Sequence, residues 1–251
     1  MCGRFASFTQ SQDLADELAI AELADDARLL PPSWNVAPTD PARIVVERAA
    51  RDSAQVTRSM RVARWGLVPS WAKDPGVGAR MINARSETLL DKPAFAKPFK
   101  ARRCLVLADG YYEWRKLGLP AAGSKKVPKQ PYWIHPAGPG VAAFAGLYEF
   151  WRNPAASETD PDRWLVSTTV VTRPASEAMS AIHDRMPLVL PPNAWDEWLD
   201  PSVGDASDLL GIDGTALTTR PVRDAVGSVQ NDGPELIEPD PEPRDPEPVL
   251  L

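Results

Sequence analysis

The chain has 251 residues, of which 43% are hydrophobic and 25% charged, and its formal net charge is −6. This apolar content is enough to fill the core of one large domain, and no apolar run approaches the roughly 20 residues of a membrane-spanning helix. Cys2 and Cys104 are the only cysteines and there are two histidines, which excludes a disulfide scaffold and a spaced zinc cluster.

Cys2 is the first residue with distinctive chemistry. Cysteine is small enough for removal of the preceding methionine, after which an amine and a thiol share one residue. Their ordinary pKa values are roughly 7.7–8.0 and about 8.5, so both have reactive forms near neutrality. The amine can form a Schiff base with an aldehyde, and the thiol can then close a thiazolidine ring. A carbonyl carbon is therefore the expected partner, although position alone leaves open an inert residue at a frayed terminus.

The N-terminal part of the chain predicts one helix and two strands. Thr9 and Gln12 have the spacing of a capping box, and Leu14 and Leu18 form an apolar stripe along a helix of about ten residues. The prolines within residues 29–33 end it. Residues 34–39 are expected to form a loop. Strands are predicted over 42–46 and 56–62, the second leading into residues 65–69.

The central part of the chain contains two candidate catalytic side chains. Residues 70–100 have weak periodicity and predict a long functional loop, in which Asn83 and Arg85 share a face if the backbone is extended. The apolar run 103–108 predicts a strand, with Cys104 as a buried structural thiol. Glu113 follows among aromatic residues, which would raise its carboxyl pKa and suit it to proton transfer. A surface acid on an alternating strand is the alternative.

The C-terminal half predicts further strands and short helices. A Gly, Pro and Lys-rich insertion at 116–131 precedes strands at 131–134, 141–150 and 164–172. A short helix starting near Pro174 leads to His183, for which a structural role remains the alternative to a catalytic one. An apolar strand is expected at 188–190, then helices at 192–199 and 205–210. We interpret Trp195 and Trp198 as core residues.

The charge is unevenly distributed. Residues 80–129 contain twelve Lys and Arg against four Asp and Glu, whereas residues 231–251 contain seven acids and Arg244 alone. The basic segment indicates either an anionic partner or a solvated face. The Pro and acid-rich residues 239–251 predict a disordered tail after one domain at 2–238. Strands with interspersed helices and no repeating strand-helix-strand unit predict an α+β fold with a mostly antiparallel, barrel-like sheet.

Seven motifs together identify a family resemblance. They are MCGRF at 1–5, NVAP at 35–38, WGLVP at 65–69, INARSE at 82–87, ADGYYEW at 108–114, IHDRMPLVL at 182–190 and GSVQNDG at 227–233. In this order the chain resembles the SRAP family, first labelled SOS-response-associated peptidases, over residues 2 to about 238. Two features depart from the family pattern: Ala72 follows Trp71 where a second aromatic residue is common, and the insertion at 116–131 varies in length.

The resemblance implies a protein that processes abasic sites in single-stranded DNA. Cys2 would form a covalent thiazolidine crosslink with the lesion aldehyde after loss of Met1, which some members of the family release themselves. Glu113 would act as general acid and base, Asn83 would hold the amine and a sugar oxygen, and His183 would assist ring opening and reversal. The implied DNA-binding residues are Arg4, Asn35, Pro38, Trp71, Arg85, Thr172 and Arg185.

The partner expected from this resemblance is single-stranded DNA, bound through its backbone more than its bases. We further expect a cytoplasmic monomer, associated with the nucleoid if bacterial, without membrane contact, metal or cofactor. Two alternatives belong to other classes. One is a noncatalytic single-strand binding module in which Cys2 is incidental. The other is an N-terminal-nucleophile glutamine amidotransferase, which also begins with Met-Cys-Gly but lacks this order of motifs.

Overall fold

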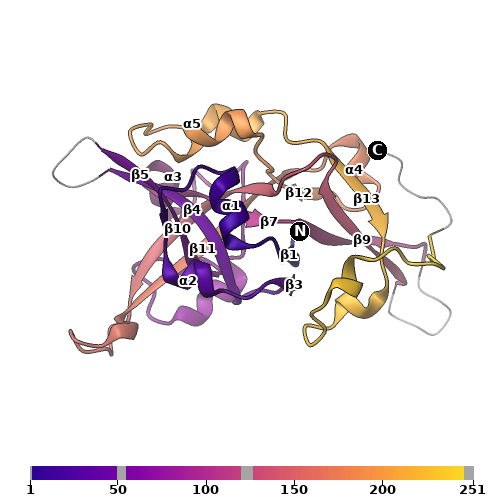
Figure 1. Ribbon diagram of the computed structural model, residues 1–251, viewed down its shortest axis with the longest axis horizontal. Coiled ribbons are helices and arrows are strands. Elements are labelled where there is room, and N and C mark those ends of the chain that lie inside the picture. Colours follow the sequence, from indigo (N-terminus) through magenta and orange to yellow (C-terminus); the bar gives the residue numbers. More distant parts are fainter. Residues whose placement is uncertain (1, 50–54, 120–126, 246–251) are drawn as a thin grey trace.

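A closed five-stranded β-barrel forms the centre of the molecule. The computed structural model describes residues 2–49, 55–119 and 127–245. The barrel strands are β4 (Pro41–Ala49), β5 (Val56–Trp65), β7 (Arg103–Ala108), β10 (Ala142–Arg152) and β11 (Trp164–Pro174). They pair in the order β11, β10, β7, β4 and β5, and β5 returns to β11 to close the ring (Figure 1). Only this closing pair is parallel, which confirms the predicted α+β fold with a mostly antiparallel barrel.

Strand β7 shows why the barrel strands are so apolar. All six of its residues are buried, because both faces of the strand are covered. Leu105 and Leu107 pack in the cluster that contains Trp198, whereas Cys104 and Val106 pack in the cluster that contains Phe5 and Trp65. Successive side chains of a strand point to opposite faces, so one run of apolar residues serves both clusters.

A second sheet brings the N-terminus against the barrel. Its strands lie in the order β13 (Leu217–Pro221), β9 (Lys129–Pro136), β8 (Gly110–Lys116), β1 (Phe5–Ser7) and β3 (Ser33–Val36). Phe5 from β1 packs edge-on against Trp65 and Phe144 of the barrel, with ring centroids 4.8 and 6.1 Å apart. This aromatic contact places the residues before Phe5 between the sheet and the barrel.

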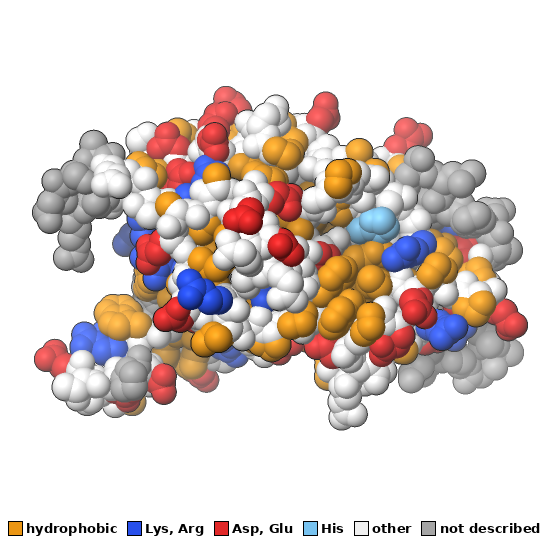
Figure 2. Space-filling view, in the orientation of Figure 1, with side chains coloured by type: hydrophobic (Ala, Val, Ile, Leu, Met, Phe, Trp, Pro, Cys, Tyr) orange, Lys and Arg blue, Asp and Glu red, His pale blue; other side chains and the backbone are white. Residues whose placement is uncertain are grey.

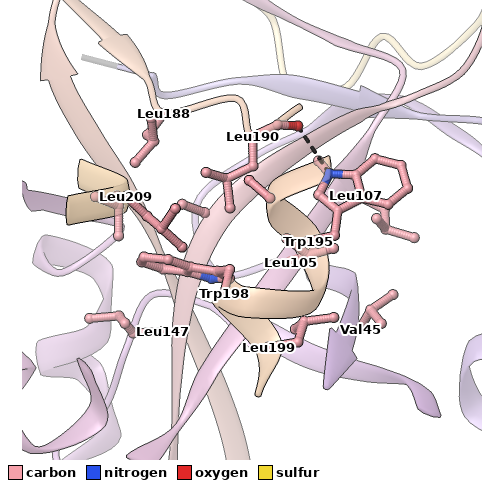
Figure 3. Packing of buried hydrophobic residues seen from close by; sticks show 14 of the residues in the cluster. Val45, Leu105, Leu107, Leu147, Leu188, Leu190, Trp195, Trp198, Leu199 and Leu209 are labelled. Carbon is pink, nitrogen blue, oxygen red and sulfur yellow. Dashed lines mark hydrogen bonds between the residues drawn. The ribbon is translucent and has the colours of Figure 1, made fainter. Parts of the chain in front are cut away.

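Short helices flank the barrel and the second sheet (Figure 1). They are α1 (Ser11–Glu17), α2 (Asp25–Leu29), α3 (Pro93–Ala101), α4 (Glu177–Ser180) and α5 (Trp195–Leu199). The indole N–H of Trp195 donates to the carbonyl of Leu190 at 3.0 Å (Figure 3). The indole N–H of Trp198 donates to the carbonyl of Cys104 at 2.9 Å. Both indoles are buried with their only polar group satisfied, as expected for core tryptophans. No helix in the described ranges has the length and apolar character to cross a membrane.

Three short strands and six 3₁₀ turns complete the described structure. The strands are β2 (Glu22–Leu23), β6 (Asn83–Arg85) and β12 (Arg185–Pro187). The 3₁₀ turns are Pro75–Arg80, Pro161–Arg163, Pro192–Ala194, Ser207–Gly211, Asp224–Gly227 and Pro234–Ile237. β6 pairs with β11 in parallel, which confirms that Asn83 and Arg85 lie on extended backbone.

The predicted capping box at Thr9 and Gln12 is wrong. The hydroxyl and the backbone N–H of Thr9 both donate to Asp109, which also accepts the N–H of Phe8 at 2.6 Å. These hydrogen bonds to Asp109, the residue just before β8, replace the expected capping hydrogen bond between Thr9 and the helix. Helix α1 begins at Ser11 and ends at Glu17, and the stripe of Leu14 and Leu18 is buried as expected.

Other elements also differ from the sequence prediction. The expected loop at 34–39 contains strand β3, and the expected loop at 70–100 contains α3 and β6. The strand predicted at 188–190 lies at 185–187, followed by an isolated bridge between Phe144 and Val189. The expected helix at 205–210 is a 3₁₀ turn, and β13 was not predicted. Residues 120–126 of the insertion lie outside the described residues.

The tail also departs from the predicted disorder over residues 239–245. Pro239 forms an isolated bridge with Val222, and the N–H of Asp240 donates to the carbonyl of Pro221 at 2.9 Å. Asp245 is 4% exposed. Residues 246–251 lie outside the described residues. The acidic segment therefore packs on the domain as far as the structure describes it.

Gly66 fixes the path of the chain after β5. Its φ is +127°, and a Cβ there would lie 2.5 Å from the carbonyl oxygen of Gly78. Glycine alone combines this left-handed backbone with so close a contact. The pair Gly66 and Gly78 closes the base of the loop that carries Trp71.

We expect Gly66→Ala to lower the free energy of unfolding by more than about 2 kcal/mol, since the new methyl group meets backbone and the φ is unfavourable. Urea unfolding measures the change. Gly138→Ala is the matched control, because a Cβ at Gly138 has no heavy atom within 4 Å. Equal stability of the two variants would contradict the packing argument.

Candidate active site

Cys2 and Asn83 form the centre of the site. Cys2 is fully buried, and the side-chain amide nitrogen of Asn83 donates to the carbonyl of Cys2 at 2.8 Å. Strand β6 holds Asn83 at this position by pairing with β11. The amide nitrogen of Asn83 is occupied by this hydrogen bond. The amide oxygen, Oδ1, is buried and accepts no hydrogen bond from any described residue. A buried acceptor in this state is rare and points to a donor from a substrate or from a processed N-terminus.

Glu113 lies beside Cys2 on β8. Its side chain is buried, and desolvation raises the pKa of its carboxyl. Burial also raises the pKa of the Cys2 thiol far above its ordinary value, and the negative charge of Glu113 raises it further. The thiol therefore keeps its proton in this environment and needs a base to react. A carboxyl with a raised pKa is suited to exchange that proton.

His183 approaches Glu113 from the turn after α4. Its charge acts on the carboxyl of Glu113 in the direction that lowers the Glu113 pKa, opposing the larger effect of burial. His183 Nδ1 accepts the backbone N–H of Arg185 at 3.0 Å and lies 2.8 Å from Asp184 Oδ1. The first contact requires an unprotonated Nδ1 and the second a protonated one. The imidazole thus has a partner at Nδ1 in either protonation state.

A cleft of about 560 Å³ opens next to His183 and is lined by Arg85, Glu87, Thr88, His183, Asp184 and Arg185. The guanidinium of Arg185 forms a two-pronged ion pair with Glu87, whose second contact measures 2.9 Å. This hydrogen bonding lowers the pKa of Glu87 to about 2. Arg185 also donates to the carbonyl of Thr172 at 2.8 Å. Arg85 is exposed at the edge of the same cleft.

Arg4 and Asn35 are joined to each other rather than to this cleft. Arg4 Nη1 donates to Asn35 Oδ1 at 2.7 Å and to the carbonyl of Val226 at 2.9 Å. Asn35 donates in turn to the carbonyls of Ser228 and Asn231 at 2.9 and 2.7 Å. Their polar groups hold the segment 226–231 against β1 and β3. Both residues therefore have a structural role, and their contact with DNA stays a prediction.

The remaining predicted DNA contacts occupy different environments. Trp71 is 69% exposed on the loop after β5, Pro38 is half-buried in the turn after β3, and Thr172 is fully buried on β11. Figure 2 shows that the Lys and Arg side chains visible on one face are separated by acidic and uncoloured atoms, while hydrophobic side chains gather near the N-terminus and β9. Trp71 is therefore accessible to a ligand, whereas Thr172 lies below the surface and accepts hydrogen bonds from Arg185.

Sequence reasoning missed two residues of the site. Tyr111 is almost fully buried, and its hydroxyl donates to the Met179 sulfur at 3.8 Å. Its pKa is raised first by burial and then by the charges of Cys2 and Glu113. Its spacing of two from Glu113 on a strand was the available signal. Glu87, the partner of Arg185, had no signal because the two residues are far apart in the sequence. In the described residues no group of three His, Cys, Asp or Glu side chains is placed to hold a metal ion.

The site therefore consists of Cys2, buried between the β-barrel and the second sheet and hydrogen-bonded by the Asn83 amide. The charge of Glu113 acts on Cys2, and that of His183 acts on Glu113. A family model matches residues 1–229 and is described as SOS response associated peptidase (SRAP). The chain belongs to this family, and the predicted resemblance is confirmed.

Two of the proteins that resemble this chain are named abasic site processing proteins. The chain is 37% identical over 205 residues to abasic site processing protein YoqW of Bacillus subtilis (strain 168), covering 82% of this chain and 83% of that protein. It is 34% identical over 193 residues to abasic site processing protein HMCES of Xenopus tropicalis, covering 67% of this chain and 54% of that protein.

Solved structures support the same fold. A Bacteroides thetaiotaomicron protein superimposes with a TM-score of 0.75 at 22% identity, covering 95% of this chain and 100% of that one. A phage-related protein of Bordetella bronchiseptica superimposes with a TM-score of 0.60 at 30% identity, covering 88% and 94%.

The pKa shifts at the site predict opposite effects for two glutamates. Because burial raises the pKa of Glu113, its ionisation opposes folding above the ordinary value of about 4.3. Glu113→Gln should therefore be more stable than the parent at pH 7, with a difference that shrinks toward pH 4. Urea unfolding at both pH values measures this.

Glu87→Gln is the control of opposite sign. The lowered pKa of Glu87 stabilises the folded state above about 4.3, and this contribution is lost as the pH falls toward the folded value of about 2. This variant should be less stable than the parent at pH 7. A Glu113→Gln protein that is also destabilised at pH 7 would contradict the account of its burial.

Proposed function

We propose that this protein processes abasic sites in single-stranded DNA by forming a covalent crosslink through Cys2. The names of its relatives support the substrate class. The observation that carries the chemistry is the hydrogen bond from Asn83 to the Cys2 carbonyl, which orients this residue and leaves Asn83 Oδ1 as a buried acceptor without a partner among the described residues.

Loss of Met1 is part of the proposal, because the nitrogen of Cys2 is a peptide nitrogen until Met1 is removed. The freed α-amine would attack the open-chain aldehyde of the abasic sugar to give a carbinolamine. Loss of water from the carbinolamine gives a Schiff base. Asn83 Oδ1 is the acceptor that can orient the amine or a sugar hydroxyl during these steps.

Glu113 would move the protons. Its raised pKa favours the protonated form that can donate to the departing hydroxyl. Departure of water then leaves an iminium ion that keeps the N–H proton, and a carboxylate on Glu113. The carboxylate takes the proton of the Cys2 thiol as sulfur attacks the iminium carbon, which restores the carboxylic acid and leaves a neutral ring nitrogen. One aldehyde and one aminothiol become a thiazolidine and one water. His183, with a partner for Nδ1 in either protonation state, would assist opening of the sugar ring and reversal of the crosslink.

Single-stranded DNA fits this arrangement because the chemistry requires the sugar to reach a buried residue. A flexible strand can place the aldehyde at Cys2 without the cost of unpairing. Arg85 and Arg185 at the cleft next to His183 would bind phosphates of the same strand, and Trp71 would stack on a base. Arg4 and Asn35 would contribute by holding segment 226–231, while Pro38 and Thr172 would shape the groove.

The first prediction of this proposal is a denaturation-stable complex. Untagged protein mixed with a single-stranded oligonucleotide that holds one abasic site should give a slower band on a denaturing gel. Cys2→Ala protein and an oligonucleotide with an intact base should give none. Mass spectrometry must show that Cys2 is the first residue. Absence of the band from such protein would leave reversible DNA binding as the better account.

A second prediction separates the roles of the two proton-transfer groups. Glu113→Gln should slow crosslink formation by about 10²–10⁴-fold, the usual contribution of a general acid or base. His183→Ala should slow the release of DNA from a preformed crosslink, measured by transfer to excess unlabelled abasic oligonucleotide. His135→Ala is the control, because His135 lies on β9 three residues after Tyr132, the partner of Glu113, and an odd separation places it on the opposite face of the strand. Equal rates for the two histidine variants would contradict the role of His183.

A further inference from the structure

The C-terminal segment 239–245 docks on the same face of the second sheet as the candidate catalytic residues. In β8 and β9 the pairs are Tyr111 with Ile134, Glu113 with Tyr132, and Arg115 with Gln130. Paired residues share a face, and residues two apart on one strand lie on that face about 7 Å apart. Arg115 and Tyr132 are thus immediate neighbours of Glu113.

Asp245 is bound by these two neighbours of Glu113. Its Oδ2 accepts from Arg115 Nη1 and from the Tyr132 hydroxyl, each at 2.6 Å. The side chain of Asp245 is 3% exposed, so the carboxylate is enclosed rather than resting on the surface. Burial and this hydrogen bond raise the pKa of Tyr132 to about 12, so its hydroxyl remains a donor at neutral pH.

Further contacts fix the backbone of the segment. The N–H of Arg244 donates to Gln130 Oε1 at 2.9 Å, and Gln130 is itself anchored by donation to the carbonyl of Val222 at 2.8 Å. The guanidinium of Arg244 pairs with Asp224. An acidic, proline-rich segment that cannot form a core of its own is therefore held by specific polar contacts at its last described residue.

The chemistry of this contact is that of phosphate recognition. A guanidinium and a phenol hydroxyl that converge on one anionic oxygen would serve a DNA phosphate equally well. The position adjoins Glu113, where the proposed function places the abasic nucleotide. Residues 239–245 contain three acids against Arg244, so the docked segment is itself anionic, as a nucleic-acid strand is.

We propose that Arg115 and Tyr132 form a phosphate-binding position next to the catalytic site, and that Asp245 occupies it as an internal competitor of the DNA. This inference rests on the proposed function. A strand that enters the site displaces residues 239–245, and its phosphate takes the place of the Asp245 carboxylate. Weakly bound nucleic acid does not displace the segment, because the tethered carboxylate has a high effective concentration.

The first test compares two acids of the same segment in the full chain. Asp245→Asn removes the docked charge and keeps the shape, whereas Glu242→Gln removes an equal charge from an exposed side chain. Binding of an undamaged single-stranded oligonucleotide is measured by fluorescence polarisation. Asp245→Asn should tighten binding by about tenfold, the effect of losing a hydrogen bond between charged groups, and Glu242→Gln by less than about twofold. Equal tightening by both variants would show a net-charge effect and overturn the proposal.

Arg115→Gln tests whether the DNA and Asp245 share one position. We expect Asp245→Asn no longer to tighten DNA binding in an Arg115→Gln background, because the Asp245 carboxylate and the DNA phosphate have both lost the guanidinium for which they compete. If Asp245→Asn tightens DNA binding as strongly with Arg115→Gln as without it, the two anions do not compete for Arg115.

Release of the segment can be followed without any activity. Trypsin cleavage after Arg244, followed by mass spectrometry, should be slow in the parent and faster in Asp245→Asn but not in Glu242→Gln. Undamaged oligonucleotide should accelerate it in the parent. If no variant binds DNA, the proposed function and this inference fall together. If the parent crosslinks abasic DNA but Asp245→Asn binds it no better, only this inference is overturned.

Discussion

The burial of the N-terminal segment between barrel and sheet is the constraint on which the rest of the structure depends. A residue as close to Met1 as Cys2 would normally lie at a frayed, solvated end. Here Phe5 packs on Trp65 and Phe144, and β1 pairs with both β3 and β8. These contacts fix the chain three residues after Cys2, so the position of its side chain varies little. Asn83 then needs to supply only one hydrogen bond to orient it.

The same burial makes ionisation of the titratable side chains in the site unfavourable. Desolvation raises the pKa of Glu113, of the Cys2 thiol and of Tyr111, so each of them favours its neutral form. A site that kept these groups charged would need compensating ion pairs such as the one between Arg185 and Glu87 at the cleft. The neutral forms avoid that need. They also leave a proton on both the thiol and the carboxyl, so in the proposed reaction the carboxyl can donate its proton first and recover one from the thiol.

The sequence predicts those parts of the fold in which local pattern and tertiary environment agree. The strand at 103–108 matches β7 because both of its faces are apolar. Strand β3 was missed because its polar Asn35 is satisfied by Arg4 and by carbonyls near residue 228, which no local pattern encodes. The capping box failed for the same reason, since Asp109 binds Thr9 across about a hundred residues. The motifs identified the candidate catalytic residues, but not the commitment of Arg4 and Asn35 to the fold.

Strand β8 links the candidate catalytic residues to the acidic C-terminal segment. The two-residue period of β8 puts Tyr111, Glu113 and Arg115 in one row, from the buried centre to the edge where Asp245 docks. An anion at Arg115 therefore acts on the row that contains Glu113, whether that anion belongs to the tail or to DNA. A chain of net charge −6 can then bind a polyanion without a basic surface throughout. When DNA displaces the acidic segment 239–245, the repulsion between the segment and the DNA phosphates is removed and the guanidinium of Arg115 becomes available to the DNA.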